Sequence, residues 1–254
     1  MNKVLSFLYG VVCYLAFFVV FLYMIGFVGD LFVPKSIDTG TEAAVAQSVI
    51  VNIALLGLFA AQHTIMARSA FKQWWTKFIP VQLERSTYVL VSSLLLALLF
   101  WQWRPILGVV WSLENTIAKT ALFGIFWLGW GIVLFSSFII SHFDLFGLRQ
   151  VWLYLSNREY HHLKFQARSL YKLIRHPLML GIIIASWATP HMTTGHLVFA
   201  ITATIYILIG IQFEERDLVH FHGQNYIDYQ GRVPMLIPLR RKRTQQQNKR
   251  LERI

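Results

Sequence analysis

Cysteine is almost absent from this sequence. The single one, Cys13, lies within the first long apolar stretch of the 254-residue chain. A lone cysteine cannot form a disulfide within the chain, and thiolate-rich zinc sites use at least two cysteines. A disulfide framework within the chain and a thiolate metal site are therefore excluded, and we predict no bound metal.

Charged residues are also scarce. Asp, Glu, Lys and Arg make up 14% of the chain, whereas 56% is hydrophobic and the mean hydropathy is +0.52. Soluble domains carry about 25% charged residues. The composition therefore indicates an integral membrane protein surrounded by a lipid bilayer.

Polar connections separate six apolar stretches, at 4–28, 45–66, 87–103, 119–141, 178–190 and 197–213. The first four approach the ~20 residues that a membrane-spanning helix needs, whereas the fifth is short. The turn residues of "TPHMTTG" predict a helical hairpin made of the fifth and sixth stretches. The predicted fold class is an all-α integral membrane protein, a bundle of five to six transmembrane helices with a C-terminal helical hairpin.

Acidic residues are about half as frequent as basic ones, 12 against 23, which gives a net charge of +11. Of the Lys and Arg residues, 20 lie in connections on one side and 3 (Lys35, Arg104 and Lys119) on the other. This bias predicts that both termini are cytoplasmic, in a bacterial-type inner membrane.

Topology and anionic lipid headgroups account for these cations, so no nucleic-acid partner is expected. The long first stretch lacks a small-residue cleavage site, so we expect a retained anchor.

Function is expected on the cytoplasmic face. The loops 29–44 and 104–118 on the other side are short and carry few acids, whereas the connection 142–177 is long and 214–239 holds acids and aromatics. Within the long connection, "LRQVWLYL" (148–155) has apolar residues at i, i+3, i+4 and i+7. That pattern is typical of an amphipathic helix, which either lies on the membrane surface or covers a site.

Arg175, His176 and Pro177 precede the fifth stretch. Proline suits a first helical turn, so Arg175 and His176 are expected at a helix N-terminus, where anions bind. Because the two helices of the hairpin are antiparallel, Glu214 and Glu215 at the end of the second are expected at the same level as Arg175 and His176 at the start of the first. An arginine suits a carboxylate and glutamates accept hydrogen bonds from hydroxyls, so this mouth suits an amino acid joined to a ribose. Two simpler interpretations stay open: Arg175 as a membrane-surface anchor, and the glutamates as a solvated helix end.

Three segments of the last third of the chain belong together: "YKLIRHPLMLG" (171–181), "EERDLVHFHGQNYIDY" (214–229) and "RVPMLIP" (232–238). As a set they resemble the membrane-embedded methyltransferases related to isoprenylcysteine carboxyl methyltransferase, which use S-adenosylmethionine. The resemblance implies one transmembrane domain, 1–239, with a cytoplasmic cofactor site within about 142–239, and we expect the basic tail 240–254 to be disordered. The cofactor contacts that it implies are the stretch from Leu163 to Gln166, Tyr171, His176, Pro177, Leu178, Met179 and one of Glu214 and Glu215, to which the charge argument above adds Arg175.

Two departures from this family bear on the substrate. Met179 stands where a tyrosine is frequent, and Gly210, Ile211 and Gln212 stand where related enzymes place an arginine for a prenylated substrate. A prenylcysteine carboxylate is therefore not expected. The stretch "SSFIISHFDLFGLRQVWLY" (136–154) is similar instead to the bacterial methanethiol S-methyltransferase branch, which implies a small volatile thiol as substrate and dimethyl sulfide as product.

A thiol must lose its proton to react, because the thiolate is the nucleophile. We predict His142 as the catalytic proton acceptor and Asp144 as its orienting partner, with His161 and His162 in reserve. Two alternatives stay open. His142 and Asp144 could be interfacial helix caps, and the sulfonium of a bound donor could itself lower the thiol pKa enough.

Other functions fit parts of the sequence. A haem protein would draw ligands from His63, His142, His161, His162, His176 and His191. It needs two facing histidines at one depth, and only His63 lies near a span interior. A non-catalytic scaffold explains the topology but gives the Arg-His-Pro and paired-glutamate set no role. Among enzymes, another thiol, a phospholipid amine or a lipid carboxylate is the alternative substrate.

Overall fold

The computed structural model describes residues 2–161, 163 and 166–238. The predicted disordered tail 240–254 and His162 lie outside the described residues. In chain order the elements are α1 (Lys3–Gly29), α2 (Val45–Ala67), α3 (Ser69–Trp75), η1 (Val81–Leu83), α4 (Glu84–Gln102), β1 (Val109–Ser112), α5 (Thr116–Ile140), α6 (His142–Leu145), α7 (Leu148–Leu155), η2 (Ser169–Lys172), α8 (Pro177–Trp187), β2 (His191–Thr193), α9 (Thr194–His222) and α10 (Gln224–Arg232).

Within the described residues, 5 helices are long and apolar enough to cross a membrane: α1, α2, α4 with its preceding η1 turn, α5 and α9. The all-α membrane fold is thereby confirmed. Helix α8 has 11 residues, so it is about 16 Å long and reaches roughly half-way across a ~30 Å hydrocarbon core. The fifth apolar stretch thus makes a half-length helix, not a sixth full span.

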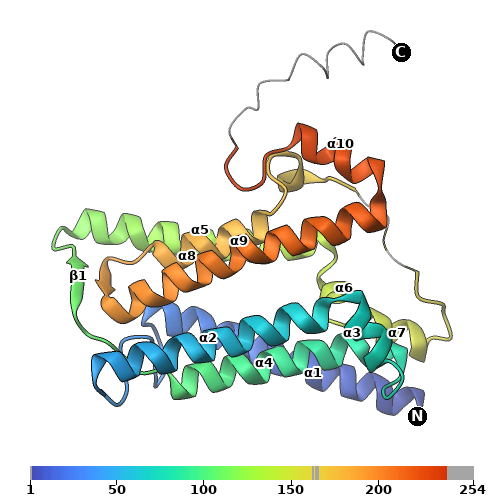
Figure 1. Cartoon of the computed structure of the whole chain (residues 1–254), viewed down its shortest axis with the longest axis horizontal. Coiled ribbons are helices and arrows are strands. Elements are labelled where there is room, and N and C mark those ends of the chain that lie inside the picture. The colour runs from blue at the N-terminus through green and yellow to red at the C-terminus, as the bar shows by residue number, and fades with distance from the viewer. Residues whose placement is uncertain (1, 162, 164–165, 239–254) are drawn as a thin grey trace, which may run out of the picture.

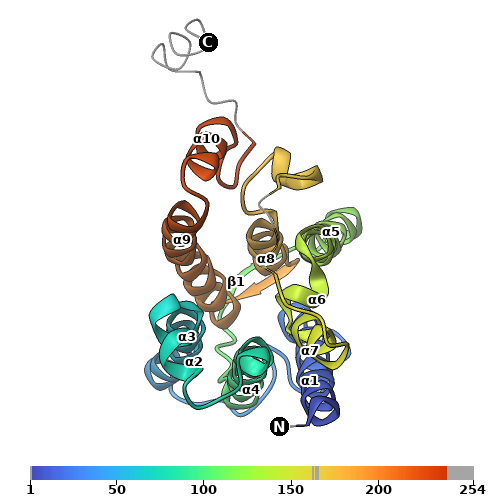
Figure 2. The same cartoon turned by 90° about the vertical axis from the view of Figure 1, so that its right-hand side faces the viewer.

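The long helices lie in two layers (Figure 1). Helices α1, α2 and α4 form one layer, and α5, α8 and α9 form the other, as the view along the bundle also shows (Figure 2). Helices α5 and α8 approach closely at Gly129 and Gly181. A Cβ atom built on Gly129 would lie 2.8 Å from the Gly181 carbonyl oxygen, and one built on Gly181 would lie 2.6 Å from the Gly129 carbonyl oxygen. Only glycine permits this approach, which is common between membrane helices.

Helices α8 and α9 form the predicted hairpin, with β2 in its turn. The Trp187 Nε1 group donates to Thr204 Oγ1 across the hairpin at 2.9 Å. Thr193 caps α9 by accepting a hydrogen bond from the His196 N–H at 3.0 Å. Both open ends of the hairpin lie at the end of the bundle that also carries the N-terminus, α6 and α7 (Figure 1). We call this the basic end.

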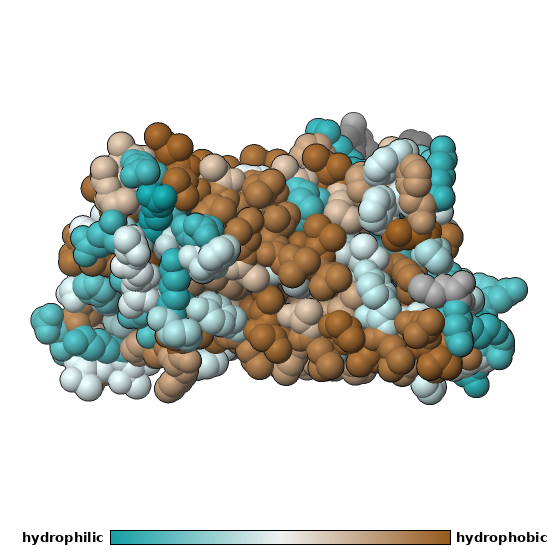
Figure 3. Space-filling view, turned by 90° about the horizontal axis from the view of Figure 1, so that it is seen from below, coloured by the Kyte–Doolittle hydropathy of each residue, from teal (hydrophilic) through white to brown (hydrophobic). Residues whose placement is uncertain are grey.

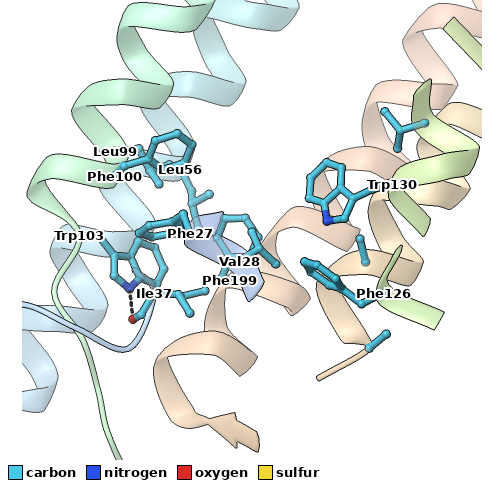
Figure 4. Close-up of a cluster of buried hydrophobic side chains, with 13 residues drawn as sticks. Phe27, Val28, Ile37, Leu56, Leu99, Phe100, Trp103, Phe126, Trp130 and Phe199 are labelled. Carbon is cyan, nitrogen blue, oxygen red and sulfur yellow. Dashed lines mark hydrogen bonds between the residues drawn. The ribbon is translucent and has the colours of Figure 1, made fainter. Parts of the chain in front are cut away.

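The opposite end of the bundle is packed closed. Trp103 is 1% exposed and its Nε1 donates to the Ile37 carbonyl at 3.0 Å, beside Phe27 and Phe100 (Figure 4). The Asn52 side chain pairs with both backbone groups of Arg104, at 2.7 and 2.9 Å. Strands β1 and β2 pair antiparallel at the same end. These contacts leave the basic end as the place for a polar site.

The molecular surface matches a bilayer. A broad hydrophobic band separates hydrophilic ends (Figure 3). Large apolar side chains such as Val19, Ile50 and Leu128 are exposed within the band. Such a contiguous apolar surface is expected of helices that face lipid.

The amphipathic segment forms α7, which packs along α1. Its buried Val151 sits over Gly10, where an added Cβ would come within 2.5 Å of Val151 Cγ2. The next residue, Trp152, packs its ring against Phe7 of α1 at 5.8 Å between ring centroids but stays exposed. Helix α7 lies beside α1 and away from α10 in both views (Figures 1 and 2). Of the two interpretations left open, the structure favours a surface helix, because α7 does not cover the hairpin mouth.

Candidate functional site

The segment that follows α10 covers the open end of the α8–α9 hairpin, which we call the hairpin mouth. The Arg175 N–H donates to the Pro234 carbonyl at 2.9 Å, and the His176 N–H donates to the Met235 carbonyl at 3.1 Å. Pro177 begins α8 as predicted. The backbone donors of Arg175 and His176, which the sequence suggested for an anion, are therefore used within the protein.

Arg175 is buried and its side chain is held by the protein itself. Its Nε donates to Glu215 Oε1 at 2.6 Å, and its Nη1 donates to the carbonyls of Val233 at 2.6 Å and Gln230 at 3.2 Å. The side chain is 6% exposed, so it is not a solvated membrane-surface anchor. Its main visible role is to fasten α8 to α9 and to the segment after α10.

His176 lies between the two glutamates. Its Nε2 is 3.0 Å from Glu215 Oε1, and its Nδ1 is 3.5 Å from Glu214 Oε2. Burial lowers the pKa of His176, but the hydrogen bonds and charges of Glu214 and Glu215 outweigh burial and raise its pKa above the usual 6.5. His176 is therefore more readily protonated than an ordinary histidine, and its charge is balanced by the carboxylates.

The two glutamates differ in what they can still bind. Glu215 accepts from Arg175, from His176 and, at 2.9 Å, from Gln230 Nε2, and its side chain is 12% exposed. Glu214 is 44% exposed, yet its Oε2 atom is buried, and its contact with His176 Nδ1 at 3.5 Å is too long for a well-formed hydrogen bond. Buried acceptors are rarely left unpaired. Glu214 therefore retains an acceptor for a ligand, whereas Glu215 is saturated.

Helix α10 completes the mouth, and sequence reasoning assigned it no individual site residue. The Tyr229 hydroxyl donates to the Tyr171 carbonyl at 2.5 Å, and Tyr226 is 2% exposed. Burial, with a smaller effect of the neighbouring Glu215, raises the pKa of Tyr229 to about 12, so its hydroxyl stays a donor at neutral pH. The tyrosines of "NYIDY", which follow the paired glutamates, were the sequence feature that could have indicated that α10 contributes to the mouth.

Known proteins match almost the whole chain. The methanethiol S-methyltransferase of Mycobacterium tuberculosis is 52% identical over 238 residues, which are 94% of this chain and 98% of that protein. Methanethiol S-methyltransferase 2 of Bradyrhizobium diazoefficiens is 54% identical over 231 residues, 91% of this chain and 89% of that protein.

The chain belongs to the methanethiol S-methyltransferase family. Nurim of Bos taurus is a more distant relative, 28% identical over 190 residues, which are 70% of this chain and 72% of that protein. No family model matches the chain, and no solved structure matches it.

In this methanethiol S-methyltransferase family member, the other residues predicted to contact the cofactor lie in different surroundings. Leu178 packs against the large core cluster, and Met179 packs against Ile207 and Ile211 beneath the mouth. Leu163 and Gln166 are exposed in the connection that precedes η2, and none of their described contacts brings them to Arg175 or Glu214.

The predicted catalytic pair is not joined by a described hydrogen bond. His142 is 5% exposed, with Nε2 at 2.9 Å from the Tyr14 hydroxyl and Nδ1 at 2.9 Å from Ser137 Oγ. Burial lowers the pKa of His142, so the ring is neutral at pH 7 and able to accept a proton. The Tyr14 partner comes from α1, 128 residues away, and sequence spacing could not reveal it.

Asp144 points to other partners. Its Oδ1 accepts from Arg149 Nη1 at 2.8 Å, and Gln150 and Tyr160 also donate to its carboxylate. Asp144 thus ties α6 to α7 and to the start of the long connection. The reserve residue His161 is exposed, 3.9 Å from Glu159.

Proposed function

We propose that this protein transfers a methyl group from S-adenosylmethionine to methanethiol and releases dimethyl sulfide. One observation carries the proposal: a buried Arg175–His176–Glu215 group presents Glu214 Oε2, a buried acceptor that has an ion-pair contact with His176 but no close hydrogen bond, at the mouth of a membrane hairpin. Two relatives about half identical to this chain are methanethiol S-methyltransferases.

The cofactor fits this mouth because its groups match what is left unsatisfied. Glu214 Oε2 would accept a hydrogen bond from a ribose hydroxyl, and Arg175 Nη2, which has no partner among the described residues, would donate to the amino-acid carboxylate. Tyr171 and the first turn of α8 (Pro177, Leu178 and Met179) would line the same mouth, and the resemblance to related methyltransferases adds Leu163 and Gln166 as cofactor contacts. When bound, S-adenosylmethionine supplies an electrophilic methyl group.

Residues of this chain would bind the thiol, exclude water from it and remove its proton. Membrane helices exclude water, which favours in-line attack by a poorly solvated thiolate. Neutral His142 would take the thiol proton, after one of its two hydroxyl partners, Tyr14 or Ser137, moves aside. Asp144 would act indirectly, because its bond to Arg149 fixes the segment that carries His142.

The basic end would face the cytoplasm of a bacterial-type inner membrane, with the N-terminus on that side. The bias of 20 cationic residues against 3 between the two sides supports this orientation. Intracellular S-adenosylmethionine would then reach the hairpin mouth directly.

The reaction is tested in membranes that contain the protein, supplied with methyl-labelled S-adenosylmethionine and methanethiol. Labelled dimethyl sulfide should appear in the headspace and should be absent with control membranes that lack the protein. Labelled product from larger thiols or lipids, with none from methanethiol, would contradict the proposed substrate.

A further inference from the structure

A second polar group lies between α2 and α4, about one turn from the ends of these helices at the basic end. The Tyr88 hydroxyl of α4 is 2.9 Å from Nε2 and 3.0 Å from Nδ1 of His63 on α2, and Ser92 Oγ is 3.3 Å from Nδ1. Tyr88 is 6% exposed. Burying polar groups within spanning helices costs free energy, so such a pair is a candidate functional site.

Helix α9 meets α2 beside this pair. The Tyr206 hydroxyl of α9 lies 3.4 Å from Thr64 Oγ1, the residue after His63. Just after the end of α2, Arg68 donates to the Phe213 carbonyl at 3.3 Å and pairs with Asp217 at 2.8 Å. The C-terminal end of α2 is therefore joined to α9 at two separate points.

Gly210 lies on α9 between these two points of contact. A Cβ atom built on Gly210 meets no atom within 4 Å, although the residue is half-buried. Gly57, Gly124, Gly131 and Gly223 also border open space, but the first three are exposed and Gly223 is the C-cap residue that follows α9. Since residues four apart share a helix face, the space at Gly210 lies on the same face of α9 as Glu214.

We propose that the thiol binds in the space at Gly210, between α2 and α9, with the Tyr88 hydroxyl donating a hydrogen bond to its sulfur. A ring N–H of His63 would donate to the Tyr88 oxygen, and the Tyr88 hydroxyl would turn from the His63 carbonyl oxygen, to which it donates at 3.4 Å, to the sulfur. The Arg85 guanidinium, 5.0 Å from the Tyr88 ring centroid, favours negative charge developing on that sulfur. This inference rests on the proposed function, because it locates the thiol of that reaction.

Filling the space tests the location. In Gly210→Ala and Gly210→Leu, we measure the KM for methanethiol and inhibition by ethanethiol and 1-propanethiol as competitors. Inhibition by the longer thiols should weaken about tenfold in Gly210→Leu, more than the methanethiol KM rises, while S-adenosylmethionine binding stays unchanged. Gly57→Leu, on the outer face of α2, should match the wild type. Equal effects on all three thiols, or none, would overturn the location.

Removing one hydroxyl tests the role of the pair. Tyr88→Phe should raise the methanethiol KM about tenfold, with S-adenosylmethionine binding unchanged. Tyr9→Phe is the matched control, because Tyr9 also makes one hydroxyl bond to α4, at 3.0 Å from Thr87 Oγ1. Equal KM values in the two variants would overturn the role. Failure of the proposed function is distinguishable, because the wild type itself would then make no dimethyl sulfide.

Discussion

Arg175 Nε lies 2.6 Å from Glu215 Oε1, and this ion pair joins the start of α8 to α9 across the open end of the hairpin. Both side chains are nearly buried, at 6% and 12% exposure. The neighbouring Glu214 has a longer contact, 3.5 Å from its Oε2 to His176 Nδ1, and it is the glutamate that we propose as the ligand-binding one.

Glu215→Gln should destabilise the protein by about 3 kcal/mol, because it leaves the buried Arg175 charge without its counter-ion. Glu214→Gln, at a more exposed side chain, should change the free energy of unfolding much less. The measurement is the thermal unfolding midpoint of each variant in detergent. Equal midpoints for the two variants would contradict the assignment of Glu215 as the structural partner.

His176 should make stability depend on pH. Its folded pKa is raised above the unfolded value of about 6.5, so its contribution is fully present below pH 6.5 and is lost as the pH rises through the folded pKa. The unfolding midpoint of the wild type should therefore fall with rising pH more than that of His176→Gln. His161→Gln, at an exposed histidine, should follow the wild type. Parallel curves for the wild type and His176→Gln would refute this effect.

His142→Gln should lower turnover of methanethiol more than about a hundredfold at pH 7, because the variant lacks a proton acceptor. The deficit should narrow towards pH 9, where more thiol is ionised without help. Turnover is followed as dimethyl sulfide formed from pH 6.5 to 9. If His142→Gln matches the wild type throughout, no dedicated base is needed and the bound sulfonium suffices.

Gly129→Ala should destabilise the bundle by about 1–3 kcal/mol, because the new Cβ would meet the Gly181 carbonyl at 2.8 Å. Gly131→Ala, two residues along the same helix, meets no atom within 4 Å and should stabilise α5 by up to about 1 kcal/mol. Thermal unfolding of both variants in detergent checks the contrast. Similar midpoints would show that the α5–α8 contact is not close.

Sequence periodicity and turn residues were enough to predict the long spans, a helix start at Pro177 and the hairpin that brings Arg175 near Glu215, but they left open whether the short fifth stretch spans the membrane. These features depend on local composition, turn residues and helix length. The long-range partners were out of reach, because Tyr14 contacts His142 from α1, and the carbonyls that Arg175 binds belong to Gln230 in α10 and Val233 just after it, 55 and 58 residues along the chain. The open space at Gly210 depends on how α2 and α9 diverge, which no local pattern encodes.

Equilibrium binding of labelled S-adenosylmethionine to membranes tests the central claim, that the hairpin mouth holds the methyl donor. Wild type should bind saturably, and Glu214→Gln should bind at least about tenfold more weakly, because it loses a charged acceptor for a ribose hydroxyl. Glu159→Gln, at an exposed glutamate of the long connection, is the matched control and should bind like the wild type. Equal affinity in the wild type and Glu214→Gln would contradict the account and place the donor elsewhere.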